Sequence, residues 1–289
     1  MQFDITMPIF LFLLCFASIK IYKKFEDKLK QILEEKEFQI KDVIVLVAVM
    51  GVMISIMMLV PSLALTVIIL FAFSMLMFTF SFIVTGKWYV SVIPPAIFVL
   101  LYYFGVFWGI PYLWNLYIID VFAILFAILI TMYLGGLFTW KTTAVFAVLL
   151  TAVDIIQVLL TGHMGEVASK AVQSELPLLV FLPILPPVYN AEQELAMMGL
   201  GLGDLFFAGL LSLQAFRELG EDAALLSIVG ISISFFAFET LLLNYKIEFF
   251  PGTLMIVCGW LPVAIIKQLR SKPLKYLSLI HISEPTRRS

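Results

Sequence analysis

Long, nearly uninterrupted apolar stretches dominate this chain. A stretch of roughly 20 mostly apolar residues is needed to cross the ~30 Å hydrocarbon core of a bilayer. With 62% hydrophobic residues, 13% charged residues and a mean hydropathy of +1.07, the chain is far more apolar than a soluble domain. We predict an all-α, polytopic membrane protein with nine transmembrane helices, all in one domain over residues 1–276. The expected spans are about 5–22, 43–60, 63–84, 89–109, 117–134, 142–160, 198–215, 223–243 and 251–268.

The count of nine depends on one junction. Only Pro61 and Ser62 separate the second and third stretches, so a single long helix kinked at the proline is the alternative.

The C-terminal end is expected to be foreign to the protein. Leu277–Arg287 reads LSLIHISEPTR, which resembles the translation of a sequencing adapter, and Arg288 and Ser289 follow it. We treat residues 277–289 as an artefactual tail and exclude them from the functional argument.

Basic residues are distributed unevenly between the two sets of loops that nine spans would create. One set holds only Lys170 and Lys246, and cytoplasmic loops normally carry the excess of Lys and Arg. We therefore expect an integral protein of the cell membrane with its N-terminus outside and its C-terminus in the cytoplasm. The richer set consists of Lys20, Lys23, Lys24, Lys28, Lys30, Lys36, Lys41, Lys87, Lys141, Arg217, Lys267, Arg270, Lys272 and Lys275.

Two connections between spans stand out. The 23–42 loop mixes lysines with acids, which predicts a solvated helical hairpin, with binding to anionic lipid as the alternative. The 161–197 segment contains the proline-rich run 176–189, whose four prolines forbid a regular helix and favour extended backbone. We expect that run to be a re-entrant segment or an edge strand resting on protein.

Four acids fall inside the expected spans, where an ionised group is costly. Asp120 is shallow enough to reach water, and Glu239 is deep enough to be a hydrogen-bonded structural acid or a functional one. Asp154 lies six residues before the end of its span and Asp204 six residues into the next, so both lie about 9 Å below the same membrane face. Antiparallel neighbouring helices would present these two carboxylates to each other.

Asp204 ends the run GLGLGD, residues 199–204. Gly199 and Gly203 have the spacing that lets a second helix approach closely, so a packing face with an incidental aspartate is one interpretation. Gly201 and Gly203 also leave the backbone before Asp204 open to a ligand, which favours a functional site.

These residues resemble the presenilin and signal peptide peptidase family of GxGD intramembrane aspartic proteases, particularly its archaeal members. The family's seventh-span motif matches Gly201-Leu202-Gly203-Asp204, and its sixth-span aspartate matches Asp154. His163 and Met164 follow in a loop position typical of the archaeal proteins.

Two motifs depart from the family. Val153 stands where the family has the tyrosine of its Tyr-Asp motif, and Pro251-Gly252-Thr253-Leu254 stands where it has Pro-Ala-Leu at the start of the ninth span. The resemblance implies catalytic roles for Asp154 and Asp204. It also implies that Gly201, Leu202, Gly203 and residues 251–254 support the active site or bind substrate.

The implied reaction is hydrolysis of a peptide bond within a transmembrane segment or a leftover signal peptide. Two carboxylates in one site are expected to share a proton, so one can activate water while the other polarises the scissile carbonyl. This chemistry needs no metal and no cofactor. The expected partners are transmembrane substrates and the lipid bilayer, and nothing in the charge balance calls for nucleic acid.

Other classes of protein remain open at this point. A proton-coupled transporter also uses paired intramembrane acids, although no inverted repeat is evident in the sequence. A prepilin-type peptidase uses GxGD as well, but cleaves at the cytoplasmic membrane face. A non-catalytic scaffold is the third alternative, because of Val153 and the altered ninth-span motif.

Overall fold

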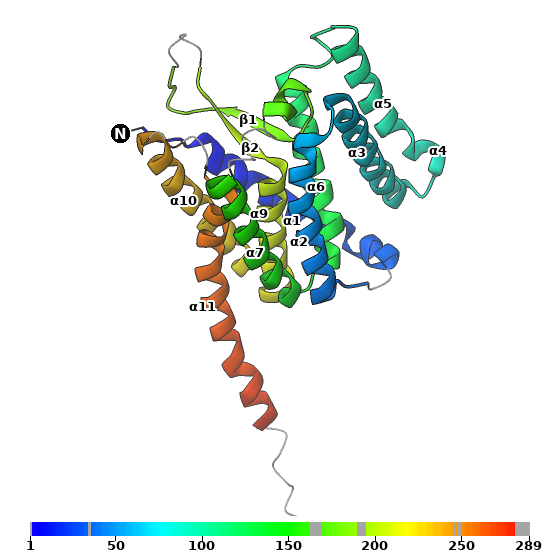
Figure 1. The fold of residues 1–289 in the computed structure, drawn as a ribbon. Helices are drawn as coiled ribbons and strands as arrows, with labels where there is room; N and C mark the ends of the chain where they lie inside the picture. Colours follow the sequence, from blue (N-terminus) through cyan, green and yellow to red (C-terminus); the bar gives the residue numbers. More distant parts are fainter. Residues whose placement is uncertain are drawn as a thin grey trace, which may run out of the picture.

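The computed structural model describes residues 2–33, 36–161, 169–189, 195–245, 247 and 250–280, and most of them are helical (Figure 1). In chain order the elements are α1 (Thr6–Leu33), α2 (Ile40–Leu59), α3 (Ser62–Thr85), α4 (Trp88–Ser91), α5 (Ile93–Tyr102), the π-helix η1 (Tyr103–Phe107), α6 (Leu116–Leu137), α7 (Trp140–Ile155), the π-helix η2 (Ile156–Thr161), β1 (Leu179–Pro183), β2 (Met197–Gly201), α9 (Leu202–Leu219), α10 (Glu221–Tyr245) and α11 (Gly252–Ile280).

Within the described residues, seven helical stretches are long and apolar enough to cross a membrane. The prediction of a helical membrane protein is confirmed at this level. The seven stretches lie in α1, α3, α4 to η1, α6, α7 with η2, α10 and α11. The second and seventh expected spans are also helical, as α2 with 20 residues and α9 with 18, but they are not among the seven. α9 carries three charged residues, Asp204, Arg217 and Glu218, which lower its apolar character.

The second and third stretches form two separate helices. Val60 and Pro61 are both extended, with ψ values of 134° and 143°, so the helix cannot continue through them. α2 then packs against α7, whereas α3 packs against α4, α5 and α6. The alternative of one long kinked helix is therefore wrong.

The expected 23–42 hairpin is partly wrong, because its first half extends α1. α1 runs on to Leu33, where the buried side chains of Tyr22 and Leu29 keep one face of the extension against the protein. Lys30 and Glu26, one turn apart on this extension, form an ion pair of 2.9 Å. Residues 34–35 lie outside the described part.

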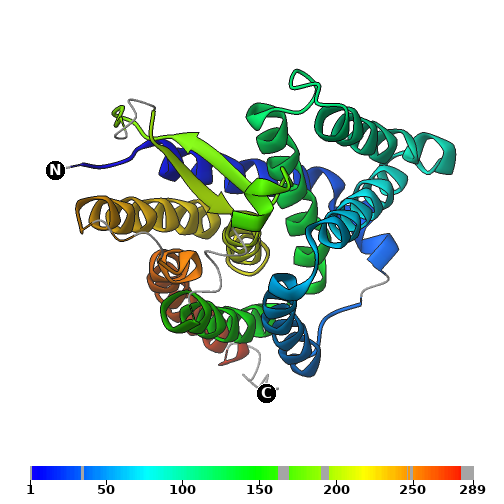
Figure 2. The ribbon, with the colours of Figure 1, turned by 45° about the horizontal axis from the view of Figure 1, so that its top comes forward.

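α9 lies at the centre of the molecule. It contacts α1, α6, α7, α10 and α11, and every residue from Leu205 to Ala215 is buried. Figure 2 shows it (yellow-green) surrounded by helices, with the β-hairpin lying across its N-terminal end. Other parts of the protein therefore surround α9, whereas the outer helices are expected to face lipid.

Glycines bring the helices around α9 close together. A methyl group at Gly209 would lie 2.6 Å from Oγ1 of Thr131 on α6, and one at Gly135 would lie 2.6 Å from Cδ2 of Leu213 on α9. The interpretation of Gly199 and Gly203 as one face of a packing helix is wrong. Gly199 belongs to β2, and no atom lies within 4 Å of where a Cβ at Gly203 would be. The packing glycines are therefore elsewhere on these helices.

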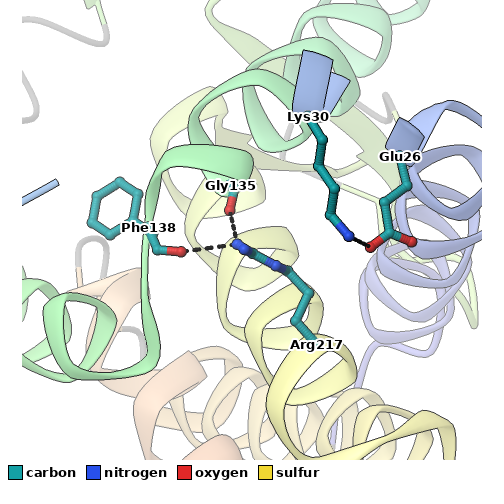
Figure 3. Close-up of polar contacts among 5 residues, drawn as sticks. All are labelled: Glu26, Lys30, Gly135, Phe138 and Arg217. Atoms are coloured by element: carbon teal, nitrogen blue, oxygen red, sulfur yellow. Dashed lines mark hydrogen bonds and ion pairs between the residues drawn. The ribbon is translucent and has the colours of Figure 1, made fainter. Parts of the chain in front are cut away.

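Arg217 joins the C-terminal ends of α9 and α6 (Figure 3). Its Nη1 donates to the backbone carbonyls of Gly135 and Phe138, at 2.9 and 2.8 Å. These carbonyls belong to the end of a helix, where the last four carbonyls lack partners within the helix and carry partial negative charge. These two carbonyls therefore stabilise the guanidinium charge of Arg217 at the end of a buried helix.

β1 and β2 form an antiparallel pair in which Leu179 faces Gly201 and Pro183 faces Met197. The extended backbone predicted for 176–189 is present as β1. The helix expected from residue 198 is wrong, since 197–201 is strand and α9 begins at Leu202. The hairpin lies at the same end of the molecule as the N-terminus, and α11 runs from there toward the opposite end (Figure 1).

Candidate active site

A cavity of about 610 Å³ opens where the β-hairpin meets α7, α9, α10 and α11. β2 contributes all five of its residues to the wall, while Asp154, Asp204 and Glu239 supply carboxylates from three different helices. The remaining wall is mostly apolar, as is usual for ligand-binding cavities. Its apolar lining is Val158, Val172, Leu179, Phe181, Met197, Met198, Leu200, Phe235, Leu242, Phe250 and Met255.

The structure brings Asp154 and Asp204 together in this cavity. Asp154 lies in the last turn of α7 and is 8% exposed, while Asp204 lies in the first turn of α9 and is partly exposed. The two carboxylates are close enough to interact electrostatically. The geometry agrees with the matching depths expected from the sequence, because the end of one helix meets the start of its antiparallel neighbour.

The start of α11 contacts both aspartates through consecutive residues. Thr253 donates its hydroxyl to Oδ2 of Asp154 at 2.6 Å and its backbone N–H to the same oxygen at 3.3 Å. Gly252 lies against the other carboxylate, since a methyl group there would be 2.6 Å from Cγ of Asp204. Pro251 accepts hydrogen bonds from the N–H groups of Leu254 and Met255, which begins the helix at this point. The Pro251–Leu254 segment thus holds the pair from one side.

The GxGD residues are divided between β2 and α9. Gly201 ends β2, lines the cavity and precedes α9 with extended backbone, and a Cβ there would lie 3.3 Å from Oδ2 of Asp204. Leu202 is buried, and its N–H donates to the carbonyl of Leu178 at 2.8 Å. Gly203 is exposed and does not line the cavity. A strand-to-helix junction therefore presents Asp204.

The helix that carries Asp154 changes form directly after it. η2 begins at Ile156, and π-helical turns of this kind occur frequently at functional sites. Val153 is turned toward α2, since its Cγ1 lies 3.4 Å from where a Cβ at Gly51 would be. It is not among the residues that line the cavity. His163 and Met164 lie outside the described residues.

Two further acids accept backbone N–H groups of β1 and of the segment that follows it. Asp120, 8% exposed on α6, accepts the N–H of Phe181 at 3.0 Å. Asp4, fully buried before α1, accepts the N–H of Leu185 at 3.0 Å and also the N–H groups of Thr6 and Met7 at the start of the helix. The sequence placed Asp120 as a shallow acid, and the structure shows what it bonds.

Glu239 lines the same cavity from the C-terminal half of α10. It is 1% exposed, and neither carboxylate oxygen has a hydrogen-bond partner among the described residues. The described residues therefore do not support the interpretation of Glu239 as a hydrogen-bonded structural acid.

The sequence did not reveal the pairing of Phe181 with Gly199. The two residues are opposite each other in the hairpin, and a Cβ at Gly199 would lie 2.7 Å from the Phe181 ring. An aromatic residue over a cross-strand glycine pins the register. Phe181 and Gly199 are 18 positions apart in the chain, too far for a local sequence pattern to reveal the pairing. Within the described residues, no group of three or more His, Cys, Asp or Glu side chains is arranged to hold a metal ion.

Comparisons with protein-family models and with curated protein sequences found no match to this chain.

Proposed function

We propose that this protein is an intramembrane aspartic endopeptidase that hydrolyses transmembrane peptides with Asp154 and Asp204. The supporting observation is the shared contact described above. Two aspartates from different helices line one cavity, and consecutive residues of α11, Thr253 and Gly252, contact one carboxylate each. The resemblance of the GLGD and PGTL segments to the GxGD protease family points in the same direction.

The contacts of the pair suggest a division of roles. Oδ2 of Asp154 accepts two hydrogen bonds from Thr253, an arrangement that suits an ionised carboxylate. We assign Asp154 the role of base, which takes a proton from the attacking water, and Asp204 the role of acid, which donates to the scissile carbonyl oxygen. The water oxygen then bonds to the carbonyl carbon, and the amide nitrogen leaves after it receives a proton. No covalent intermediate forms with the enzyme.

The hairpin supplies a surface for the unwound substrate. A peptide bond inside a helix is shielded, so the substrate must become extended before water can attack. β2 lines the cavity beside Asp204, and β1 already occupies its other side. An extended substrate would add to β2 as a third strand, a mode in which main-chain hydrogen bonds provide the affinity.

The orientation proposed from the loops determines which substrates fit. Arg217 lies in the last turn of α9, at the end away from the hairpin. Lys23 of α1 lies at the same end, because it bonds to Glu221 at the start of α10. If this basic end faces the cytoplasm, the cavity is nearer the outer face. The family's signal peptide peptidases have this orientation, so the preferred substrates would be spans or leftover signal peptides with a cytoplasmic N-terminus. Protease mapping that finds Lys23–Lys30 on the outside would contradict this orientation.

The deciding experiment uses purified protein in detergent and a labelled single-span peptide. Asp154→Asn and Asp204→Asn keep the shape of each side chain and remove its ionisable group. We expect wild-type protein to cleave the peptide and each variant to lose at least about a thousandfold in rate. The product is followed by mass spectrometry.

Asp222→Asn is the matched control. Asp222 undergoes the same chemical change on an exposed site in the first turn of α10, away from the cavity, and we expect its rate to equal the wild-type rate. Cleavage that persists in either dyad variant, or folded wild-type protein that cleaves nothing, would contradict the proposal.

A further inference from the structure

Glu239 is a buried acid that the mechanism above does not use. Its side chain is 1% exposed, both carboxylate oxygens lack a partner among the described residues, and it lines the same cavity as the aspartate pair. Phe235 and Leu242, one turn before and after it on α10, line that cavity too. Since a buried carboxylate without a partner is costly, the site is incomplete without a hydrogen-bond donor.

Asp4, an acid that interacts with Glu239, cannot supply this donor. Asp4 lies close enough to interact electrostatically with Glu239. Its own oxygens already accept three backbone N–H groups, from Thr6, Met7 and Leu185. Asp4 therefore contributes charge without offering a donor to its neighbour.

The described residues lining the cavity contain no balancing cation. Asp154, Asp204 and Glu239 are acidic, and no Lys, Arg or His is among those lining residues. An incoming group that carries positive charge would be favoured by the ionised carboxylates among them, and a charged donor would also supply the hydrogen bond that Glu239 lacks. A lysine or arginine could also lay its apolar stem along Phe235 and Leu242 while its charged end reaches Glu239.

We propose that Glu239 forms a subsite for a cationic side chain of the substrate, a lysine or arginine close to the scissile bond. This proposal rests on the proposed proteolytic function, since it places the subsite in the same cavity as the cleaved bond. It narrows the substrate class from apolar spans in general to spans that carry a basic residue within reach of the pair. Such residues occur where a span approaches the membrane surface, at the depth expected for this cavity.

Binding to an inactive enzyme tests the subsite without requiring cleavage. In the Asp204→Asn background, the affinities of fluorescent single-span peptides are measured by anisotropy. Each peptide carries lysine or norleucine at one position, and the position is moved through the central and outer part of the span. We expect about a ten- to hundredfold preference for lysine at one position, the range for a hydrogen bond to a charged group. Cleavage of the same peptides by protein with an intact pair is measured in parallel.

Two substitutions at the site are compared with one elsewhere on α10. Glu239→Gln keeps the size and hydrogen-bonding capacity but removes the charge, and Glu239→Leu removes both. Each should reduce the lysine preference to about twofold or less. Glu221→Gln, the same change at an exposed residue that begins the helix, should keep the full preference. Thermal unfolding identifies any variant that fails to fold.

The outcomes separate the two proposals. A lysine preference that depends on Glu239, combined with no cleavage by the protein whose aspartate pair is intact, supports the subsite and contradicts the protease. Cleavage without any lysine preference supports the protease and overturns the subsite. Equal affinities for the two series, no measurable binding of either, or a preference retained in Glu239→Gln would each overturn the subsite.

Discussion

The centre of this molecule and its rim are both built from apolar helices, but these helices differ in how much of their surface is buried by protein. We define the rim as α2 to η1, residues Ile40–Phe107, and the centre as α9. In the most apolar stretch of α3, on the rim, 17% of residues are buried inside the protein, while every residue from Leu205 to Ala215 in α9 is buried. Rim helices can be apolar on all sides because lipid surrounds them, whereas α9 is surrounded by protein.

Polar side chains of α9 bond to a neighbouring helix. Gln214 of α9 donates to the carbonyl of Gly135 at 2.8 Å, and Arg217 donates to the same carbonyl. Neighbouring helices thus supply partners that lipid could not. α9, which carries Asp204, is accordingly not among the seven stretches that are apolar enough to be recognised as spans. Hydropathy therefore identifies the outer helices more readily than the central helix α9.

Gly252→Ala tests how tightly the centre is packed around Asp204. A methyl group there would lie 2.6 to 2.8 Å from the carboxylate atoms of Asp204, so the carboxylate must move. Displacing a catalytic group by about 1 Å can lower the rate about a hundredfold, and we expect a loss of at least that size. The measurement is kcat/KM on the single-span peptide.

Gly203→Ala is the matched comparison within the GxGD run. No atom lies within 4 Å of where its Cβ would be, and we expect the rate to stay within about threefold of wild type. Equal losses in the two variants would show that the close contact at Gly252 is not what limits activity.

The sequence predicted the helical membrane fold and the encounter of Asp154 with Asp204, since both depend on distances along regular helices. It misplaced the start of α9, because an apolar run followed by GLGLGD fits strand and helix equally until its partner strand is known. It did not reveal that Asp120 accepts the N–H of Phe181, or that Asp4 accepts the N–H of Leu185. These bonds join residues far apart in the chain, and no local pattern encodes them.

Thr253→Val tests the second contact of α11. Valine keeps the shape and removes the hydroxyl that donates to Asp154 at 2.6 Å, while the backbone N–H remains. Loss of one hydrogen bond to a charged group predicts about a ten- to hundredfold lower kcat/KM. Thr253→Ser retains the hydroxyl and should recover most of the rate. If valine and serine behave alike, the hydroxyl does not act on Asp154 as proposed.

Gly209→Ala tests the packing of the centre apart from the chemistry. A methyl group would lie 2.6 Å from Oγ1 and 2.9 Å from Cγ2 of Thr131, whose side chain is fully buried. Overpacking of this kind costs about 1–3 kcal/mol, partly offset by the better helix propensity of alanine. We expect a lower Tm in detergent.

Gly51→Ala on α2 makes the same change on the rim and gives the smallest effect. The nearest atom, Cγ1 of Val153, would be 3.4 Å from the new methyl group, which is ordinary van der Waals contact. Because alanine favours a helix by about 1 kcal/mol relative to glycine, Tm should stay unchanged or rise slightly. A fall in Tm as large as that of Gly209→Ala would mean that α2 is packed as tightly as α9. Opposite signs for the same substitution would show that protein contacts constrain the centre and leave the rim free to vary.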